Sequence, residues 1–182
     1  MVPTSYLKIA RDAIKARLDG IHMNRNALLS TDPELLKKKA TFVTLTLHEQ
    51  LRGCIGSLIA HRNLLDDLIA NAESAAFNDP RFTPLTTVEL DEVKIEVSLL
   101  SEPKNIIYTD KNELKYLIHT GSDGVIIRLG NYQATFLPQV WEELPDFDTF
   151  FTHLGMKAGI GSNPLSYHPE IYTYQVDKIK ES

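Results

Sequence analysis

The stretch TFVTLTLHEQLRGCIGSL, residues 41–58, contains two candidate strands joined by a short polar turn. Val43, Leu45 and Leu47 alternate with threonines, which is typical of a strand with one buried face. The polar residues 48–50, HEQ, predict the turn. We therefore expect the second half of the stretch to return beside the first half as an antiparallel strand.

The returning strand, LRGCIG at residues 51–56, holds the only cysteine of the chain, Cys54. In an unbroken strand Arg52, Cys54 and Gly56 share one face. A guanidinium group on that face favours a thiolate over a thiol, and Gly53 and Gly56 leave room for a ligand or another backbone. The same pattern also fits a purely structural role, because free cysteines are often buried and strand glycines often mark bulges.

Helices are predicted where apolar residues recur at helical spacing behind a capping residue or a proline. The first ends at Gly20, and residues 21–31 and the segment around 81–84 are predicted to be loops. The predicted helices follow Thr4 or Ser5, Asp32, Asn63, Asp110 and Asp146, with a short helical piece around Trp141.

Further strands are predicted over residues 93–99, 125–129, 132–137 and 171–176. These strands come mostly in adjacent hairpins, and the helices lie between them without a regular βα alternation. The order favours an α+β fold with mostly antiparallel sheets flanked by helices over a doubly wound parallel sheet.

Two other segments contain candidate ligand-binding side chains. In DPRF, Asp79 and Arg81 flank a proline that fixes the turn, so Arg81 could present a rigid fork to a carboxylate or a phosphate. The alternative is a local ion pair between Asp79 and Arg81. In GMKAG, residues 155–159, Lys157 lies between glycines and could bind an anion, although such a lysine more often caps helix carbonyls.

Composition narrows the classes of function. The net charge is −5 and the pI is about 5.7, with one basic run at residues 37–39, so we do not expect nucleic-acid binding. One cysteine and six scattered histidines predict no metal site. Dinucleotide, P-loop, GxSxG and HExxH motifs are absent. No apolar run reaches the roughly 20 residues of a membrane span, and no signal peptide is recognisable, so we expect a cytoplasmic protein without membrane contact.

Several motifs in the same order make the chain resemble the AMMECR family, named for a chromosomal region linked with Alport syndrome and elliptocytosis. The resemblance covers nearly the whole chain and is closest to the prokaryotic type of the AmmeMemoRadiSam system. The motifs are TFVTL at 41–45, LRGCIGSL at 51–58, NAESAAFNDPRFTPL at 71–85, IEVSLLSEP at 95–103, GVII at 124–127, ATFLPQVWEELP at 134–145 and FFTHLGMKAGI at 150–160.

The resemblance implies one AMMECR-like domain over residues 1–182, made of two packed lobes with LRGCIG in or near a cleft between them. It also implies a pathway shared with Memo-like and radical-SAM proteins, and it specifies neither a reaction nor a cofactor. We consider two hypotheses. The first is an enzyme in which Cys54 and Arg52 are catalytic, with an anionic substrate bound by the remaining candidates: Gly53, Gly56, Asp79, Arg81 and Lys157. The second is a non-catalytic adaptor or ligand carrier for those partners.

Overall fold

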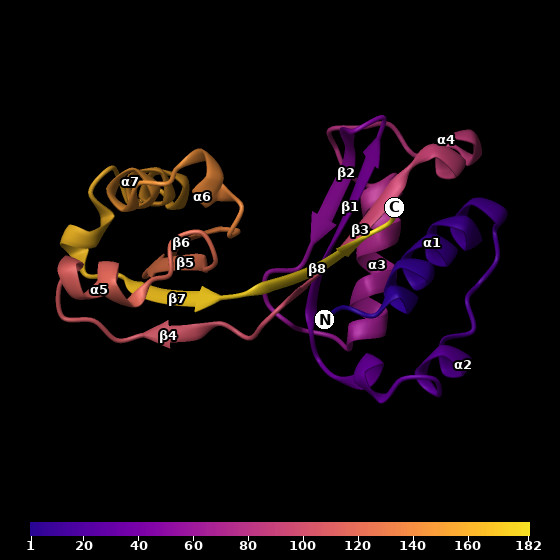
Figure 1. The fold of residues 1–182 in the computed structure, drawn as a ribbon, viewed down its shortest axis with the longest axis horizontal. Coiled ribbons are helices and arrows are strands. Elements are labelled where there is room, and N and C mark those ends of the chain that lie inside the picture. Colours follow the sequence, from indigo (N-terminus) through magenta and orange to yellow (C-terminus); the bar gives the residue numbers. More distant parts are fainter. The chain divides into compact units, whose positions relative to one another are not determined.

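The computed structural model describes residues 1–182 and contains two four-stranded sheets, each covered by helices (Figure 1). The predicted α+β class with mostly antiparallel sheets is confirmed. Contacts within the chain divide it into two units: unit 1 comprises residues 1–100 and 177–182, and unit 2 comprises residues 101–176. Unit 1 is therefore discontinuous, because the end of the chain returns to it.

The sheet of unit 1 has the strand order β2-β1-β3-β8, which places β2 at an edge. The predicted hairpin of β1 and β2 is present, and its two turn residues, His48 and Glu49, adopt positive φ angles of 52° and 65°. The strands are β1 (Ala40–Leu47), β2 (Gln50–Gly56), β3 (Lys94–Leu100) and β8 (Val176–Lys180).

Helices α1 and α3 pack against each other on one face of this sheet and enclose the core of unit 1 (Figure 1). Asn63 caps α3 as predicted, and Gly20 ends α1 in a left-handed conformation, also as predicted. The N-terminal cap of α1 is Pro3, not Thr4 or Ser5. The helices are α1 (Thr4–Asp19), α2 (Arg25–Leu29), the 3₁₀ helix η1 (Pro33–Leu36), α3 (Leu64–Phe77) and α4 (Thr87–Glu92).

A fully buried carboxylate joins α3 to the sheet. Asp67 accepts hydrogen bonds from the backbone N–H and the hydroxyl of Thr41 on β1, at 2.8 and 2.7 Å. It also accepts from the hydroxyl of Ser57 at 2.8 Å, from Nε of Arg62 at 2.7 Å and from the amide of Asn71 at 3.0 Å. A buried charge is stable only when it is satisfied in this way, so the network fixes the N-terminal part of α3 on β1.

Unit 2 contains the second sheet, in the order β4-β7-β5-β6, with α7 packed on β5 and β6. Its core is aromatic: Trp141 stacks on Phe150 at 3.6 Å between ring centroids and donates from Nε1 to the carbonyl of Asp123. The elements are β4 (Lys104–Ile106), α5 (Lys111–Leu117), β5 (Gly124–Leu129), β6 (Tyr132–Phe136), α6 (Val140–Glu143), α7 (Phe147–Ala158), the 3₁₀ helix η2 (Pro164–Tyr167) and β7 (Glu170–Tyr174).

Besides the cap of α1, two predictions of local structure are wrong. The single strand over residues 171–176 is two strands, β7 and β8, which belong to different sheets and meet near Gln175. There the backbone N–H of Gln175 donates to the hydroxyl of Ser101 at 2.8 Å. Helix α2 lies within residues 21–31, which were predicted to be a loop, and α4 lies in a segment for which no element was predicted. Both helices are too short to show a helical period.

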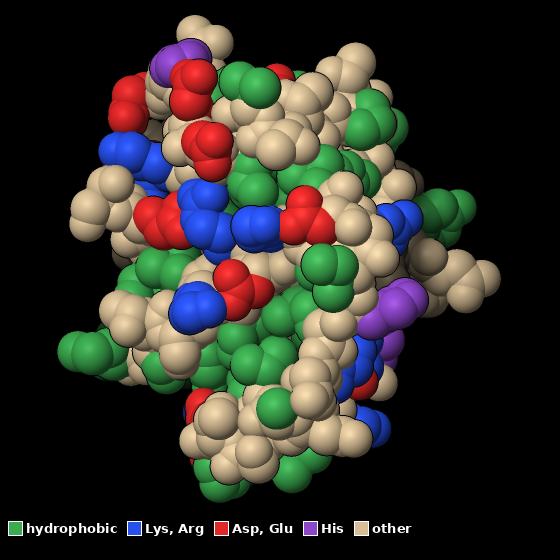
Figure 2. Space-filling view, turned by 90° about the vertical axis from the view of Figure 1, so that its right-hand side faces the viewer, with side chains coloured by type: hydrophobic (Ala, Val, Ile, Leu, Met, Phe, Trp, Pro, Cys, Tyr) green, Lys and Arg blue, Asp and Glu red, His purple; other side chains and the backbone are tan.

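Charged side chains of opposite sign lie next to one another on the face of the molecule in Figure 2, where blue and red alternate across the middle. Two ion pairs on the surface of α1 join a lysine to an aspartate four residues later, Lys8–Asp12 and Lys15–Asp19. None of the helices combines the length and apolar character that crossing a bilayer requires.

Replacing the buried carboxylate of Asp67 should lower the stability of the protein. We expect Asp67→Ala to lower the free energy of unfolding by about 3–5 kcal/mol, because it leaves Arg62 and the donors of Thr41 without their acceptor. Asp12→Ala, which removes an exposed helix pair, should cost below about 1 kcal/mol. Urea unfolding of both variants measures the difference; equal costs would contradict the central role of Asp67.

Candidate functional site

A β-bulge in β2 determines the direction of Arg52. Leu45 of β1 pairs with Gly53 and Thr46 pairs with Leu51, so Arg52 has no partner residue on β1. Arg52 and Gly53 are consequently both buried, although they are neighbours in the strand. The predicted strict alternation, with Arg52 and Cys54 on one uninterrupted face, is therefore wrong at this point, because the extra residue changes the phase of the strand.

The Arg52 guanidinium is bound to two groups outside the sheet. Its Nη2 donates to the carbonyl of Thr83 at 2.8 Å and to Glu89 of α4 at 2.9 Å, and its Nε donates to the other carboxylate oxygen of Glu89 at 3.4 Å. The hydrogen bonds from Arg52, and next those from the backbone of Thr86, hold the pKa of Glu89 below its usual range. Nη1 of Arg52 is buried and makes no hydrogen bond within the protein.

Cys54 is half-buried, and each of its polar groups has a neighbour. The sulfur lies 3.2 Å from the hydroxyl of Thr44, its partner residue on β1. Its backbone N–H donates to Oδ2 of Asp79 at 3.0 Å, and its carbonyl accepts from Nη2 of Arg81 at 3.5 Å. Asp79 and Arg81 thus satisfy both backbone groups that the edge strand β2 presents here.

Asp79 and Arg81 form a two-point ion pair. Nε and Nη2 of Arg81 donate to the two carboxylate oxygens at 3.1 and 2.8 Å. The side chain of Asp79 is 2% exposed, whereas that of Arg81 is 55% exposed. The hydrogen bond from Arg81 is the largest cause that lowers the pKa of Asp79 well below its usual range; the backbone N–H groups of Cys54 and Arg81 add to it and burial opposes it.

The ring of Phe82 lies near both guanidinium groups, 5.8 Å from Cζ of Arg52 and 5.5 Å from Cζ of Arg81. Segments that are far apart in the sequence therefore converge around one thiol, all within unit 1. We name this set the Cys54 cluster; its members are Arg52, Cys54, Asp79, Arg81, Phe82 and Glu89.

The two glycines of the motif allow close packing inside the protein. A Cβ atom on Gly53 would lie 2.1 Å from the backbone oxygen of Ala75 in α3. A Cβ atom on Gly56 would lie 2.2 Å from the ring of Phe42. The space that the missing side chains leave is thus filled by α3 and by an aromatic ring of β1.

Lys157 is not part of this cluster. It belongs to α7 in unit 2, where its Nζ donates to the carbonyl of Thr135 at 2.9 Å and lies 5.2 Å from the ring centre of Phe136. Sequence reasoning missed Thr44 and Glu89. The capping box of Thr86 and Glu89 can be recognised in the sequence and indicates α4, the helix that carries Glu89. The alternation of β1 places Thr44 on the face of the strand opposite its buried residues. No group of three or more His, Cys, Asp or Glu side chains is arranged to hold a metal ion.

The contact between Gly53 and α3 leads to a stability prediction. We expect Gly53→Ala to lower the free energy of unfolding by about 2–3 kcal/mol, because a backbone oxygen cannot give way as a flexible side chain can. Gly130→Asn, in an open turn with φ 60°, should cost below about 1 kcal/mol, since asparagine tolerates that conformation. Denaturant unfolding tests both, and a Gly53→Ala protein as stable as the parent would refute the packing argument.

The ion pair of Asp79 leads to a prediction about pH. A carboxylate whose pKa is lowered by folding stabilises the protein above its unfolded pKa of about 3.9, and this contribution is lost as the pH falls towards the folded value. We therefore expect Asp79→Asn to cost on the order of 2 kcal/mol at pH 7, and the deficit to shrink below about pH 4. Thermal unfolding across this range measures it; a deficit independent of pH would argue against the pair.

Comparison with known proteins agrees with this architecture. The chain is 38% identical over 180 residues to a protein of Methanothermobacter thermautotrophicus, covering 96% of this chain and 92% of that one. It is 39% identical over 160 residues to a protein of Sulfolobus acidocaldarius, covering 85% of this chain and 70% of that one. The crystal structure of the uncharacterised protein PH0010 from Pyrococcus horikoshii superimposes with a TM-score of 0.83 at 31% identity, over 98% of this chain and 90% of that one.

The AMMECR1 family model matches residues 7–179, which include every motif quoted above, all of unit 2 and most of unit 1. With this match and with relatives above 30% identity over nearly its whole length, the chain belongs to the AMMECR1 family.

Proposed function

We propose that the Cys54 cluster is a thiol-dependent site for a small anionic substrate, and that the chain is an enzyme acting through it. The observation that carries the proposal is that the exposed guanidinium group of Arg81 binds at the half-buried Cys54, where its Nη2 lies 3.5 Å from the backbone carbonyl of that cysteine. Cysteine is the most nucleophilic side chain near neutral pH, so a ligand held at Arg81 would lie within reach of a reactive group.

Arg81 keeps a donor for an incoming anion. Asp79 occupies Nε and Nη2, while Nη1 makes no hydrogen bond to the protein. Because Asp79 shares the charge of the guanidinium, Arg81 attracts a substrate oxyanion less strongly than an unpaired arginine would, and we expect substrate affinities on the order of millimolar. In this proposal Asp79 acts as a positioning residue that fixes the guanidinium fork.

Arg52 also acts as a positioning residue in the proposal. Its bonds to Glu89 and Thr83 hold α4 and the preceding segment against β2, next to the thiol. The buried Nη1 has no acceptor within the chain, and such a donor calls for an ordered water or a ligand oxygen.

Alkylation with two reagents of different charge tests the proposal. Iodoacetate carries a carboxylate and iodoacetamide does not, so a cation beside the thiol favours iodoacetate. We expect the ratio of the two rate constants for Cys54 to exceed that of a free thiol such as N-acetylcysteine by at least about threefold, equivalent to roughly 0.7 kcal/mol. Arg81→Gln should return the ratio to the free-thiol value.

Arg128→Gln is the matched control, because Arg128 is an exposed, carboxylate-paired arginine of unit 2 and its loss should leave the ratio unchanged. Mass spectrometry assigns the modified residue, and Cys54→Ser gives the background. A wild-type ratio equal to that of the free thiol, or one that Arg81→Gln leaves intact, rejects an anion site at Cys54.

A second candidate function is a non-catalytic adaptor or ligand carrier for Memo-like and radical-SAM proteins. It is favoured by large apolar side chains that are exposed on β2 and just after it: Leu51, Leu58 and Ile59 are 43%, 39% and 62% exposed. Exposed apolar groups near a sheet edge suit contact with a partner protein. The shared pathway with these partners remains part of both candidates.

The two candidates predict different behaviour in a binding assay with purified Memo-like and radical-SAM proteins. The adaptor requires a complex that survives Cys54→Ser and is lost in a Leu51→Asp, Ile59→Asp double variant. The enzyme hypothesis requires neither a complex with these proteins nor an effect of the double variant on one. Absence of any complex at micromolar protein concentration counts against the adaptor.

A further inference from the structure

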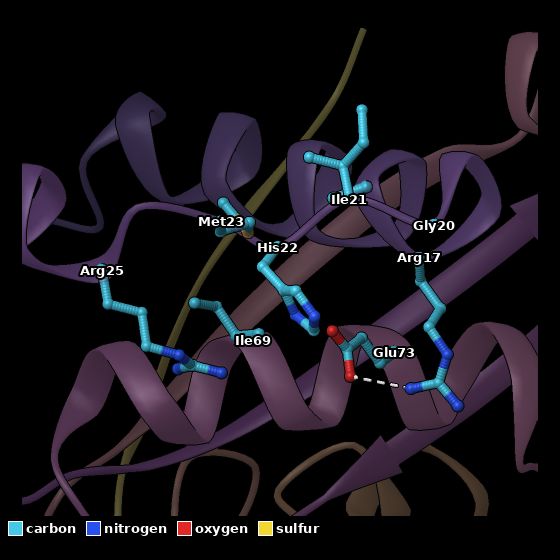
Figure 3. A pocket seen from close by; sticks show the side chains of 9 residues that line it. Arg17, Gly20, Ile21, His22, Met23, Arg25, Ile69 and Glu73 are labelled. Atoms are coloured by element: carbon cyan, nitrogen blue, oxygen red, sulfur yellow. Dashed lines mark hydrogen bonds and ion pairs between the residues drawn. The ribbon is translucent and has the colours of Figure 1, made fainter.

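A second site is suggested by a pocket of about 420 Å³ in unit 1, away from the Cys54 cluster in the chain (Figure 3). It lies over the middle of α3, between the last turn of α1 and the segment that leads into α2. Its volume lies in the lower part of the range of pockets for small molecules. The residues that matter here are Arg17, His22, Met23, Arg25, Ile69 and Glu73.

The left-handed end of α1 forms one wall of the pocket. At Gly20 the chain reverses with φ 69°, and the backbone N–H groups of Gly20 and Ile21 donate to carbonyls of the last turn. Because these carbonyls are satisfied and Arg17 lies in the same turn, the negative end of the helix dipole is partly offset. The reversal carries the following residues back across α3, so His22 and Arg25 face the same space as Arg17 (Figure 3).

The two arginines of the pocket have more free donors than the other arginines of the chain. Of seven arginines, five make at least two hydrogen bonds each: Arg11, Arg52, Arg62, Arg81 and Arg128. Arg17 makes one, to Glu73 at 3.4 Å, and Arg25 makes one, to Asp66 at 2.5 Å. A guanidinium group has five N–H donors, and its fork matches a carboxylate or a phosphate, so both forks are open for an oxyanion.

The side chains on the floor of the pocket favour a ligand that also has a hydrogen-bond donor and an apolar part. Figure 3 shows the His22 imidazole directed toward Glu73, with Arg17 and Arg25 on opposite sides of that pair. The Glu73 carboxylate would repel an anion that approaches it directly, but it accepts a hydrogen bond from a hydroxyl or an amino group. Ile69 and Met23 supply the apolar part of the lining.

From this arrangement we propose that the pocket binds a small organic oxyanion, a carboxylate or a phosphate ester, that also carries a hydroxyl or amino group. Arg17 and Arg25 bind the anionic group, and Glu73 accepts the hydrogen bond from the hydroxyl or amino group. The site is independent of the thiol chemistry proposed for Cys54 and uses none of the residues of the Cys54 cluster.

Isothermal titration calorimetry of the full chain at low salt tests the site. The probes are O-phospho-L-serine, glycerol 3-phosphate and L-malate, with glycerol as the uncharged comparison. We expect at least one anionic probe to bind with a Kd below about 1 mM and glycerol not to bind. We expect Arg17→Gln and Arg25→Gln each to weaken binding about tenfold and the double variant to abolish it.

Two controls distinguish binding in this pocket from binding elsewhere on the protein. Arg128→Gln removes an exposed arginine of unit 2 and should leave the affinity unchanged. Cys54→Ser should also leave it unchanged, so that failure here and failure at the Cys54 cluster are distinguishable. Thermal unfolding confirms that the variants are folded, as expected for side chains that are 58% and 48% exposed. No binding by any anionic probe, binding that survives the double variant, or binding that Cys54→Ser removes overturns the proposal.

Discussion

The buried carboxylate of Asp67 is the interaction on which the rest of unit 1 depends. It accepts hydrogen bonds from Thr41 on β1 and from Ser57 in the loop after β2. It also accepts from Arg62, just before α3, and from Asn71 within α3, so it fixes the N-terminal part of α3 on the sheet. At the other end of the helix, Gly53 lets β2 reach the backbone of Ala75. A polar anchor and a close backbone contact together define where α3 lies, because a buried charge and a steric contact both tolerate little displacement.

Both candidate sites depend on the placement of α3. The chain leaves the C-terminal end of this helix and passes directly into Asp79 and Arg81, which bind the exposed edge of β2 at Cys54. The outer face of the same helix carries Glu73 and forms the floor of the pocket lined by Arg17 and Arg25. The core-facing side of α3 therefore stabilises the unit, whereas its end and its outer side position charged groups for ligands. A change that shifted α3 would alter both sites together.

Much of the fold could be predicted from local patterns. The hairpin of β1 and β2, the caps at Asn63, Asp110 and Asp146 and the α+β class all follow from alternation, helical period or capping chemistry, and all are present. Helix α4 was missed although Thr86 and Glu89 form a capping box, because six residues are too few to show a period. The division of the last strand between two sheets was also missed, since alternation continues through Gln175 and only pairing partners reveal the break.

The sequence alone determined the family resemblance, the secondary structure of the long elements and the residue types around Cys54, because each depends only on residues that are close together in the chain. Only the tertiary structure decided what those residues contact. The bulge at Arg52 directs its guanidinium to Glu89, 37 residues away, and leaves Arg81 as the exposed cation near the thiol. Such pairings depend on strand register and on the path of a connecting loop, and these are settled by packing across the whole unit and not by any local pattern.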